Sequence, residues 1–75
     1  MELTAYRDAQ MYARPYQLRK DRRWTTGVHI LRGDEVTVYT ASNTWPTRED
    51  AVRHSLWFGC QIIDGTIVPQ VSHSS

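Results

Sequence analysis

Three histidines and one cysteine are the side chains in this sequence best suited to bind zinc or to pair as a nucleophile and its base. His29, His54 and His73 are far apart along the chain, and Cys60 is the only cysteine. Zinc sites pair their ligands a few residues apart, and no such pair occurs here. The glycine patterns of phosphate-binding loops are also missing from the sequence. We therefore predict no metal, no cofactor and no catalytic residue, and we predict that the protein is not an enzyme.

A cysteine nucleophile is the enzymatic alternative that the composition leaves open. Cys60 would need His54 or His29 beside it as a base, and nothing in their spacing indicates that they meet. A single thiol in an apolar stretch usually packs as a small hydrophobic side chain. We expect this packing role for Cys60.

A basic run is the second feature that could carry function. Its members are Arg14, Arg19, Lys20, Arg22, Arg23 and Arg32, and Asp21 is the only acid within the run. Arginines hold phosphates and aromatic rings stack on bases, so the turn Arg19–Trp24 and the sheet beside it could bind nucleic acid. The residues assigned to this site are Arg19, Arg22, Arg23, Trp24, His29 and Tyr39. The competing explanation is a solvated turn that protects a sheet edge, and the net charge of only +1 favours it.

The third feature is a surplus of aromatic residues. The chain has three Trp, four Tyr and one Phe, which is more than one thin core can bury. Trp57 falls at the centre of the helix face that should meet water, and aromatic anchors are typical of protein interfaces. The residues assigned to a partner-binding surface are Arg53, His54, Trp57 and Gln61. Alternatively, the chain's own ends fold over Trp57 through Tyr6, Met11 or Ile67.

A single small domain of 75 residues must position these side chains. Below about 80 residues one core supplies only about 3–5 kcal/mol of stability, and a lone cysteine allows no internal disulfide. Oligomerisation or an aromatic-rich core is therefore expected to support the fold. The sequence shows neither a secretory leader nor an apolar run that could span a membrane, so we expect a cytoplasmic location.

The chain divides into a segment at 1–11, a domain at 12–68 and a flexible tail at 69–75. Alanines recur in the first segment at helical spacing and indicate a short helix, although its tyrosines fit a strand equally well. Within the domain we predict a strand at 16–19, placed at a sheet edge by Pro15, and two further strands at Trp24–Leu31 and Val36–Thr40. Thr66–Val68 has room for a short fourth strand.

A helix is predicted over Arg48–Gln61. Thr47 is its N-cap, Asp50 takes the capping-box position, and Asp64-Gly65 ends the helical stretch. A stripe of small residues at spacing four should let this helix lie close to the sheet. Its members are Ala51, Ser55 and Gly59.

The two central strands are predicted to form a hairpin around Gly33. Pairing Val28 with Val38 and Ile30 with Val36 gathers branched side chains on one face, which requires an odd-length connection with Gly33 in the left-handed region. The same register sets Gly27 against Tyr39 on the outer side. The core predicted from these faces consists of Val28, Ile30, Val36, Val38, Ala51, Val52, Leu56 and Ile63.

These elements predict an α+β fold: a three-stranded antiparallel meander packed against one C-terminal helix, with the optional fourth strand. The strand Trp-x-x-Gly-Val-x-Ile, the opening Thr-Arg-Glu-Asp-Ala and the closing Ile-Ile-Asp-Gly resemble small bacterial single-domain proteins of unknown function. The βββα order is also similar to the three-stranded sheet domains of plant transcription factors and phage integrases, which implies DNA reading by the sheet. This chain departs from that second pattern, because Thr37, Val38 and Tyr39 stand where those domains place arginines.

The function expected from the sequence is that of a small, non-catalytic regulatory module. It would act through protein–protein interaction, with a partner or with a second copy as a homodimer, through Arg53, His54, Trp57 and Gln61. The alternative is a nucleic-acid-binding domain that uses the sheet face and the Arg19–Trp24 turn. No membrane partner is expected.

Overall fold

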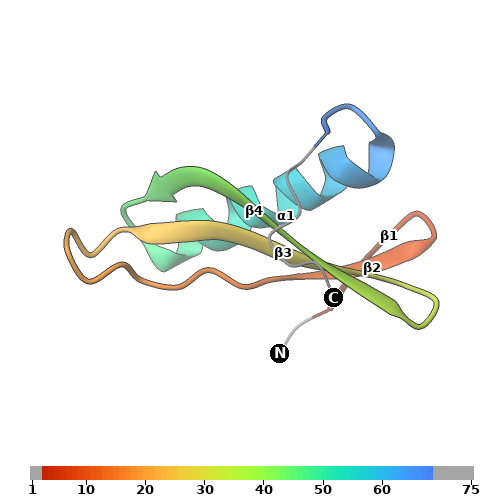
Figure 1. Ribbon diagram of the computed structural model, residues 1–75, viewed down its shortest axis with the longest axis horizontal. Coiled ribbons are helices and arrows are strands. Elements are labelled where there is room, and N and C mark those ends of the chain that lie inside the picture. Colours follow the sequence, from red (N-terminus) through yellow and green to blue (C-terminus); the bar gives the residue numbers. More distant parts are fainter. Residues whose placement is uncertain (1–2, 69–75) are drawn as a thin grey trace.

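The chain folds into a four-stranded antiparallel sheet with one helix across one face, as the computed structural model shows for the residues it describes, 3–68 (Figure 1). The elements are β1 (Thr4–Tyr6), β2 (Ala9–Ala13), β3 (Trp24–Arg32), β4 (Glu35–Trp45) and α1 (Arg48–Asp64). Each strand pairs with the next one in the chain. The predicted α+β class, an antiparallel sheet packed against one C-terminal helix, is confirmed. The predicted tail at 69–75 lies outside the described residues.

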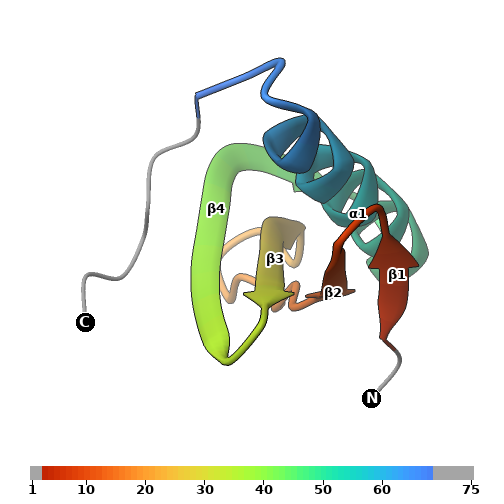
Figure 2. The same cartoon turned by 90° about the vertical axis from the view of Figure 1, so that its right-hand side faces the viewer.

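Helix α1 lies along one face of the sheet, which we call the inner face, and the opposite face is the outer face (Figure 2). The helix contacts β2, β3 and β4. Thr47 caps it as predicted, because the Thr47 side chain accepts a hydrogen bond from the Asp50 N–H at 3.1 Å. The helix runs to Asp64, one turn beyond its predicted end, and Gly65 closes it with φ 78°.

The fourth strand comes from the N-terminal segment, so of the two alternatives left open there the strand is correct and the short helix is not formed. Strands β1 and β2 form a hairpin in which Tyr6 pairs with Ala9. Ala9 and Met11 are buried while Gln10 between them is exposed, which is the alternation of a strand. The alanine spacing is compatible with this hairpin as well as with a helix. Pairing of β2 with β3 decides between them, because it satisfies backbone groups along that side of β3.

The strand predicted at 16–19 is not formed, and neither is the one at 66–68. Pro15 cannot donate to a ladder, and β2 ends at Ala13. Beyond it the chain keeps single contacts with β3, such as the hydrogen bond from the Thr25 N–H to the Tyr16 carbonyl at 2.9 Å. At the other end of the domain, the Thr66 N–H donates to the Gln61 carbonyl and ends α1 instead of starting a strand.

The β3–β4 register differs from the predicted one by a single residue. Gly33, with φ 61°, and Asp34 form a two-residue turn that pairs Arg32 with Glu35. A glycine with positive φ at the first central position is what a type II′ hairpin turn requires. The left-handed Gly33 is therefore confirmed, and the predicted odd-length connection is wrong.

This shift exchanges the two faces of β4. The observed cross-strand pairs include Val28 with Tyr39, Ile30 with Thr37 and Gly27 with Thr40. Tyr39 therefore faces the helix, and its predicted place on the outer face is wrong. Val36 and Val38 lie on the outer face, where Val36 is 55% exposed, so their assignment to the core is also wrong. Branched residues favour a strand, but they do not specify which face is buried.

The core lies between the inner face and α1. Its buried apolar residues are Ala9, Met11, Val28, Ile30 and Ala51. The predicted stripe of small residues faces it, since Ala51 and Ser55 are 0% exposed and Gly59 is also buried. A Cβ at Gly59 would lie 2.7 Å from the Met11 Sδ, so only glycine lets the helix approach this closely. Ser55 fixes the register of helix and sheet, because its Oγ accepts the Gly27 N–H at 3.1 Å.

Candidate functional site

Trp57 stands on the exposed side of α1, at the rim of a hollow between the helix and the end of β4. Its side chain is 61% exposed. The hollow has a volume of about 270 Å³, and its lining includes His54, Trp57 and Gln61 from the helix. Arg53 joins His54 and Trp57 at a second, shallow apolar depression. The structure thus places the four predicted partner-binding residues on one surface.

Trp45 and Phe58 also line this hollow, although neither was predicted to belong to it. We call these two residues together with Arg53, His54, Trp57 and Gln61 the Trp57 patch. The patch combines aromatic rings with a guanidinium and an amide at its border. That mixture of an aromatic centre and a polar border is typical of protein interfaces.

A ring stack holds the patch in place. The imidazole of His54 lies on the indole of Trp45, with ring centroids 3.7 Å apart and ring planes 1° apart. The Trp45 Nε1–H donates to the Thr26 Oγ1 at 2.8 Å, and the Thr26 hydroxyl donates to the Asn43 carbonyl at 2.9 Å. Thr26 at the centre of this chain of hydrogen bonds is 4% exposed, and the two bonds are partly buried, so they fix the orientation of the indole.

An irregularity in the sheet makes this arrangement possible. The β3–β4 register shifts between Thr25 and Thr26, so that Thr26 pairs with Ala41 while Thr25 pairs with Thr44. The extra residues on β4 turn the Asn43 carbonyl toward the Thr26 hydroxyl. Bulges often redirect side chains in this way. No local pattern in the sequence marks this shift, and it is the reason that Trp45 was missed.

Among the residues that the structure describes, those proposed as the alternative cover for Trp57 do not bury it. Met11 is 1% exposed because it lies in the core beneath Gly59. The Tyr6 hydroxyl donates to the Asp64 carboxylate at 2.8 Å, at the far end of α1. Ile67 lines the same hollow as Trp57, yet the indole keeps its 61% exposure.

The predicted nucleic-acid-binding residues do not form one surface. Arg19 and Arg22 are exposed in the loop, but the Arg23 side chain is half-buried and donates to the Thr44 Oγ1 at 2.8 Å and to the Thr44 carbonyl at 2.9 Å. Trp24 is half-buried opposite Trp45. His29 lies on the outer face, whereas Tyr39 lies on the inner face. The set therefore separates into loop residues, an outer-face residue and half-buried residues.

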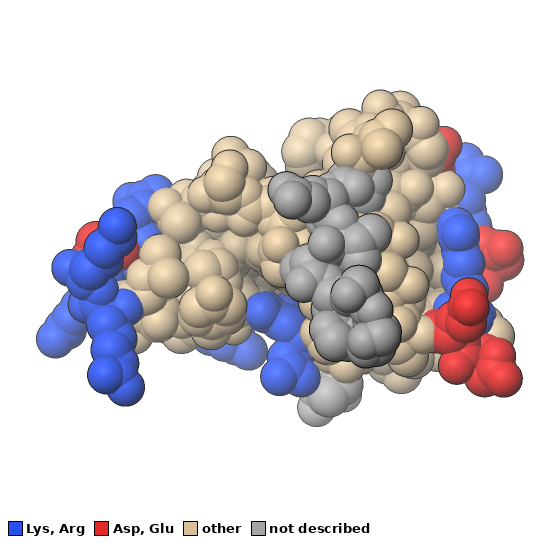
Figure 3. All heavy atoms as spheres, in the orientation of Figure 1, with Lys and Arg blue, Asp and Glu red and all other residues tan. Residues whose placement is uncertain are grey.

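Charged residues are nevertheless distributed unevenly between the two ends of the molecule. Lys and Arg gather at the end that carries the loop between β2 and β3, whereas both signs of charge mix at the opposite end (Figure 3). The ion pairs among the described residues are Arg7–Asp64, Arg32–Asp8 and Arg53–Asp50. None of these pairs involves a basic residue of the loop. The loop end thus carries an excess of positive charge, because Asp21 is its only acid and forms none of these ion pairs.

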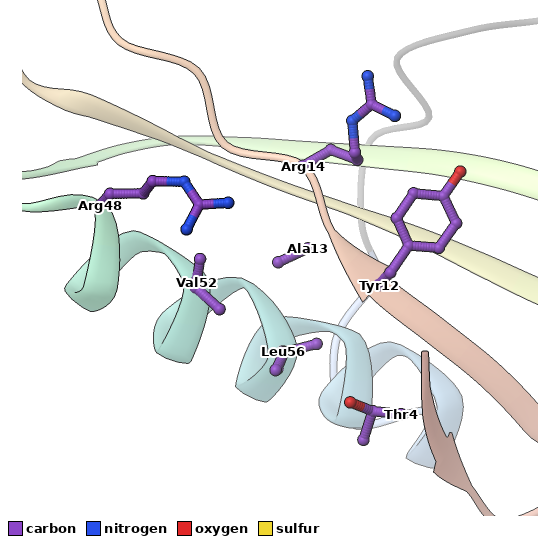
Figure 4. Close-up of a pocket in the computed structure, with 7 residues that line it drawn as sticks. All are labelled: Thr4, Tyr12, Ala13, Arg14, Arg48, Val52 and Leu56. Atoms are coloured by element: carbon purple, nitrogen blue, oxygen red, sulfur yellow. The ribbon is translucent and has the colours of Figure 1, made fainter. Parts of the chain in front are cut away.

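Another hollow, of about 280 Å³, opens between the end of β2 and the first turns of α1. Ala13, Val52 and Leu56 point into it, and the Arg48 guanidinium extends over Val52 (Figure 4). The Arg14 side chain points away from the helix instead. The two guanidinium groups therefore do not point to a common position. An anion in this hollow could not be bound by both of them at once.

Cys60 is the residue that was considered as a nucleophile. Burial raises the pKa of the Cys60 thiol above its ordinary value of 9.0, and Asp64 raises it further, so the nucleophilic thiolate is disfavoured. Cys60 packs against the core cluster. Within residues 3–68, no three His, Cys, Asp or Glu side chains come together as metal ligands. No helix in the same part of the chain is long and apolar enough to cross a membrane.

Comparison of the chain with protein-family models, with curated proteins and with solved structures found no match. The geometry described above is therefore the basis for a functional interpretation.

Proposed function

We propose that this protein is a non-catalytic regulatory module of the cytoplasm that binds another protein molecule through the Trp57 patch. The observation that carries the proposal is the 61% exposure of Trp57 beside a ring stack held by partly buried hydrogen bonds. A rigid surface loses little conformational entropy when it binds. Tryptophan is also prominent among the few residues that dominate interface energies.

A second copy of the chain is the occupant that the surface favours. In a two-fold dimer the same patch must supply both the protruding and the receiving part. Trp57 protrudes, and the hollow lined by Trp45, Phe58 and Gln61 lies directly beside it. Rotation about an axis between the two would seat each Trp57 in the hollow of the other copy. Self-association would also support a domain of this size, which has no disulfide.

The side chains of the patch suit such a contact electrostatically. The Arg53 guanidinium is already paired with the Asp50 carboxylate at 2.8 Å, so the border of the patch carries a neutralised pair. Two like patches can therefore meet without bringing unpaired arginines together. The absence of repulsion distinguishes this face from the basic loop end.

Photo-crosslinking from position 57 tests the proposal. A benzophenone amino acid replaces Trp57, the protein is irradiated in its host cells, and the crosslinked peptides are sequenced. The expected product is a dimer of the chain whose crosslink maps to the hollow around Trp45 and Phe58. Replacement of the exposed Tyr16 by the same benzophenone amino acid is the matched control and should give no such dimer. Crosslinks that map only to other surfaces, or equal dimer yields from both positions, would contradict the proposal.

A further inference from the structure

The outer face of the sheet presents two rings and a guanidinium beside the basic loop. Tyr12 lies opposite His29 in the β2–β3 register, and their ring centroids are 4.6 Å apart. The Arg14 guanidinium lies 6.0 Å from the centre of the Tyr12 ring. Tyr12 and Arg14 both point away from α1, in contrast to Ala13 between them (Figure 4). None of the described helices and strands packs on this face.

Tyr16 extends the row of aromatic residues toward the loop. It is 63% exposed, and its backbone is tied to Thr25 of β3 by hydrogen bonds at 2.9 Å and 3.0 Å. The exposed ring is thus carried by backbone that is anchored to the sheet. The ring is therefore held in place by its backbone while its face stays accessible to a ligand.

Positive charge continues from these rings into the loop. Arg19, Lys20 and Arg22 are exposed, and none of them pairs with a carboxylate among the described residues. Asp21 is the only acid of the loop, and its Oδ1 accepts the Arg23 backbone N–H at 3.1 Å. Burial lowers the pKa of the His29 imidazole, and the positive charge of Arg14 lowers it further.

One exposed ring, two half-buried rings and the basic side chains of the loop that form no ion pair fit one class of polymer. A single-stranded nucleic acid offers unstacked base faces to aromatic rings and phosphates to arginines at the same time. In a duplex the base faces are already stacked on one another, so the rings would have no role. A peptide rich in acidic residues would satisfy the arginines but not the rings.

We propose that the outer face, through Tyr12, Arg14, Tyr16 and His29, binds single-stranded nucleic acid whose phosphates run onto Arg19, Lys20 and Arg22. This site is separate from the Trp57 patch, on the other side of the sheet from the helix. It also differs from the set predicted from sequence, because Tyr39, Trp24 and Arg23 take no part in it.

Fluorescence anisotropy with labelled oligo(dT) and oligo(U) of about a dozen nucleotides tests this site. Binding is expected at low salt and should weaken steeply as salt rises. The double variant Arg19→Gln, Lys20→Gln should bind more weakly and should lower the slope of log affinity against log salt by about 0.7 for each lost phosphate contact. Tyr16→Ala should weaken binding about fivefold or more, which is the smallest effect expected for a lost base stack.

Two controls separate this site from general electrostatics and from the proposed function. The double variant Arg7→Gln, Arg32→Gln removes the same charge at the opposite end of the molecule and should bind like the wild type. Trp57→Ala should also keep nucleic-acid binding, even though it disrupts the protein contact. The proposal is overturned if neither oligonucleotide binds at low salt, if duplex DNA binds as tightly as the single strands, or if both charge variants lose affinity equally.

Discussion

The imidazole of His54 lies flat on the indole of Trp45, with 3.7 Å between the ring centroids. One ring belongs to α1 and the other to the last residue of β4, and only Pro46 and Thr47 separate these elements in the chain. The stack therefore fixes the angle at which the helix leaves the sheet. It also forms one wall of the hollow beside Trp57, so the same contact serves the fold and the proposed docking surface.

Thr26→Val should destabilise the protein by about 1–3 kcal/mol. The substitution keeps the shape of the side chain but leaves the partly buried Trp45 Nε1–H without its acceptor and the Asn43 carbonyl without its donor. Chemical denaturation measures the change in the free energy of unfolding. Thr40→Val, on the exposed side of β4, is the matched control and should stay within about 0.5 kcal/mol of the wild type. Equal stability of both variants would show that the hydrogen-bond chain does not support Trp45.

Gly59→Ala should also destabilise the protein, although alanine favours an exposed helix by about 1 kcal/mol relative to glycine. The new Cβ would lie 2.7 Å from the Met11 Sδ and 3.1 Å from the Val28 Cγ2, and both side chains are buried. Overpacking of this kind costs about 1–3 kcal/mol. A double-mutant cycle provides the control, since Gly59→Ala should cost less when Met11 is already alanine. A stabilising effect in the wild-type background would mean that the helix does not approach the sheet this closely.

His29 should make stability depend on pH. Burial lowers its pKa below the ordinary 6.5, and Arg14 lowers it further, so the folded protein binds this proton less tightly than the unfolded chain does. Stability from this group is therefore present above pH 6.5 and is lost as the pH falls through 6.5 toward the folded-state pKa. The midpoint of thermal unfolding, measured from about pH 7.5 to about pH 5, should fall more for the wild type than for His29→Gln. Parallel curves for the two proteins would contradict this assignment.

Features set by neighbouring residues were predictable from the sequence. Thr47 as N-cap, Gly65 as the helix end and the buried stripe around Ser55 each depend on a few positions of one helix. The exposure of Trp57 follows from the same helical spacing. Local patterns of this kind act within one or two turns, so they can be recognised without knowing the rest of the fold.

Features that depend on pairing between distant segments were not predictable. The N-terminal hairpin shares its alanine spacing with a helix, and only β3 decides between the two. The tight turn at Gly33 shifts every side chain of β4 by one position, which moved Tyr39 inward and Val36 outward. The stack of His54 on Trp45 depends on a register shift that has no local sequence signal.

Sedimentation equilibrium of the wild type and Trp57→Ala over a broad concentration series is the most direct test of the docking surface. The proposal predicts that the wild type approaches twice the mass of the chain as concentration rises, because each Trp57 is buried in the other copy. Trp57→Ala should remain monomeric and folded, since Trp57 is 61% exposed, and it should unfold like the wild type at concentrations low enough for the wild type to be monomeric as well. Tyr16→Ala removes an equally exposed ring elsewhere and should still form the dimer. A wild type that stays monomeric throughout, or a Trp57→Ala protein that dimerises like the wild type, would contradict the proposed contact.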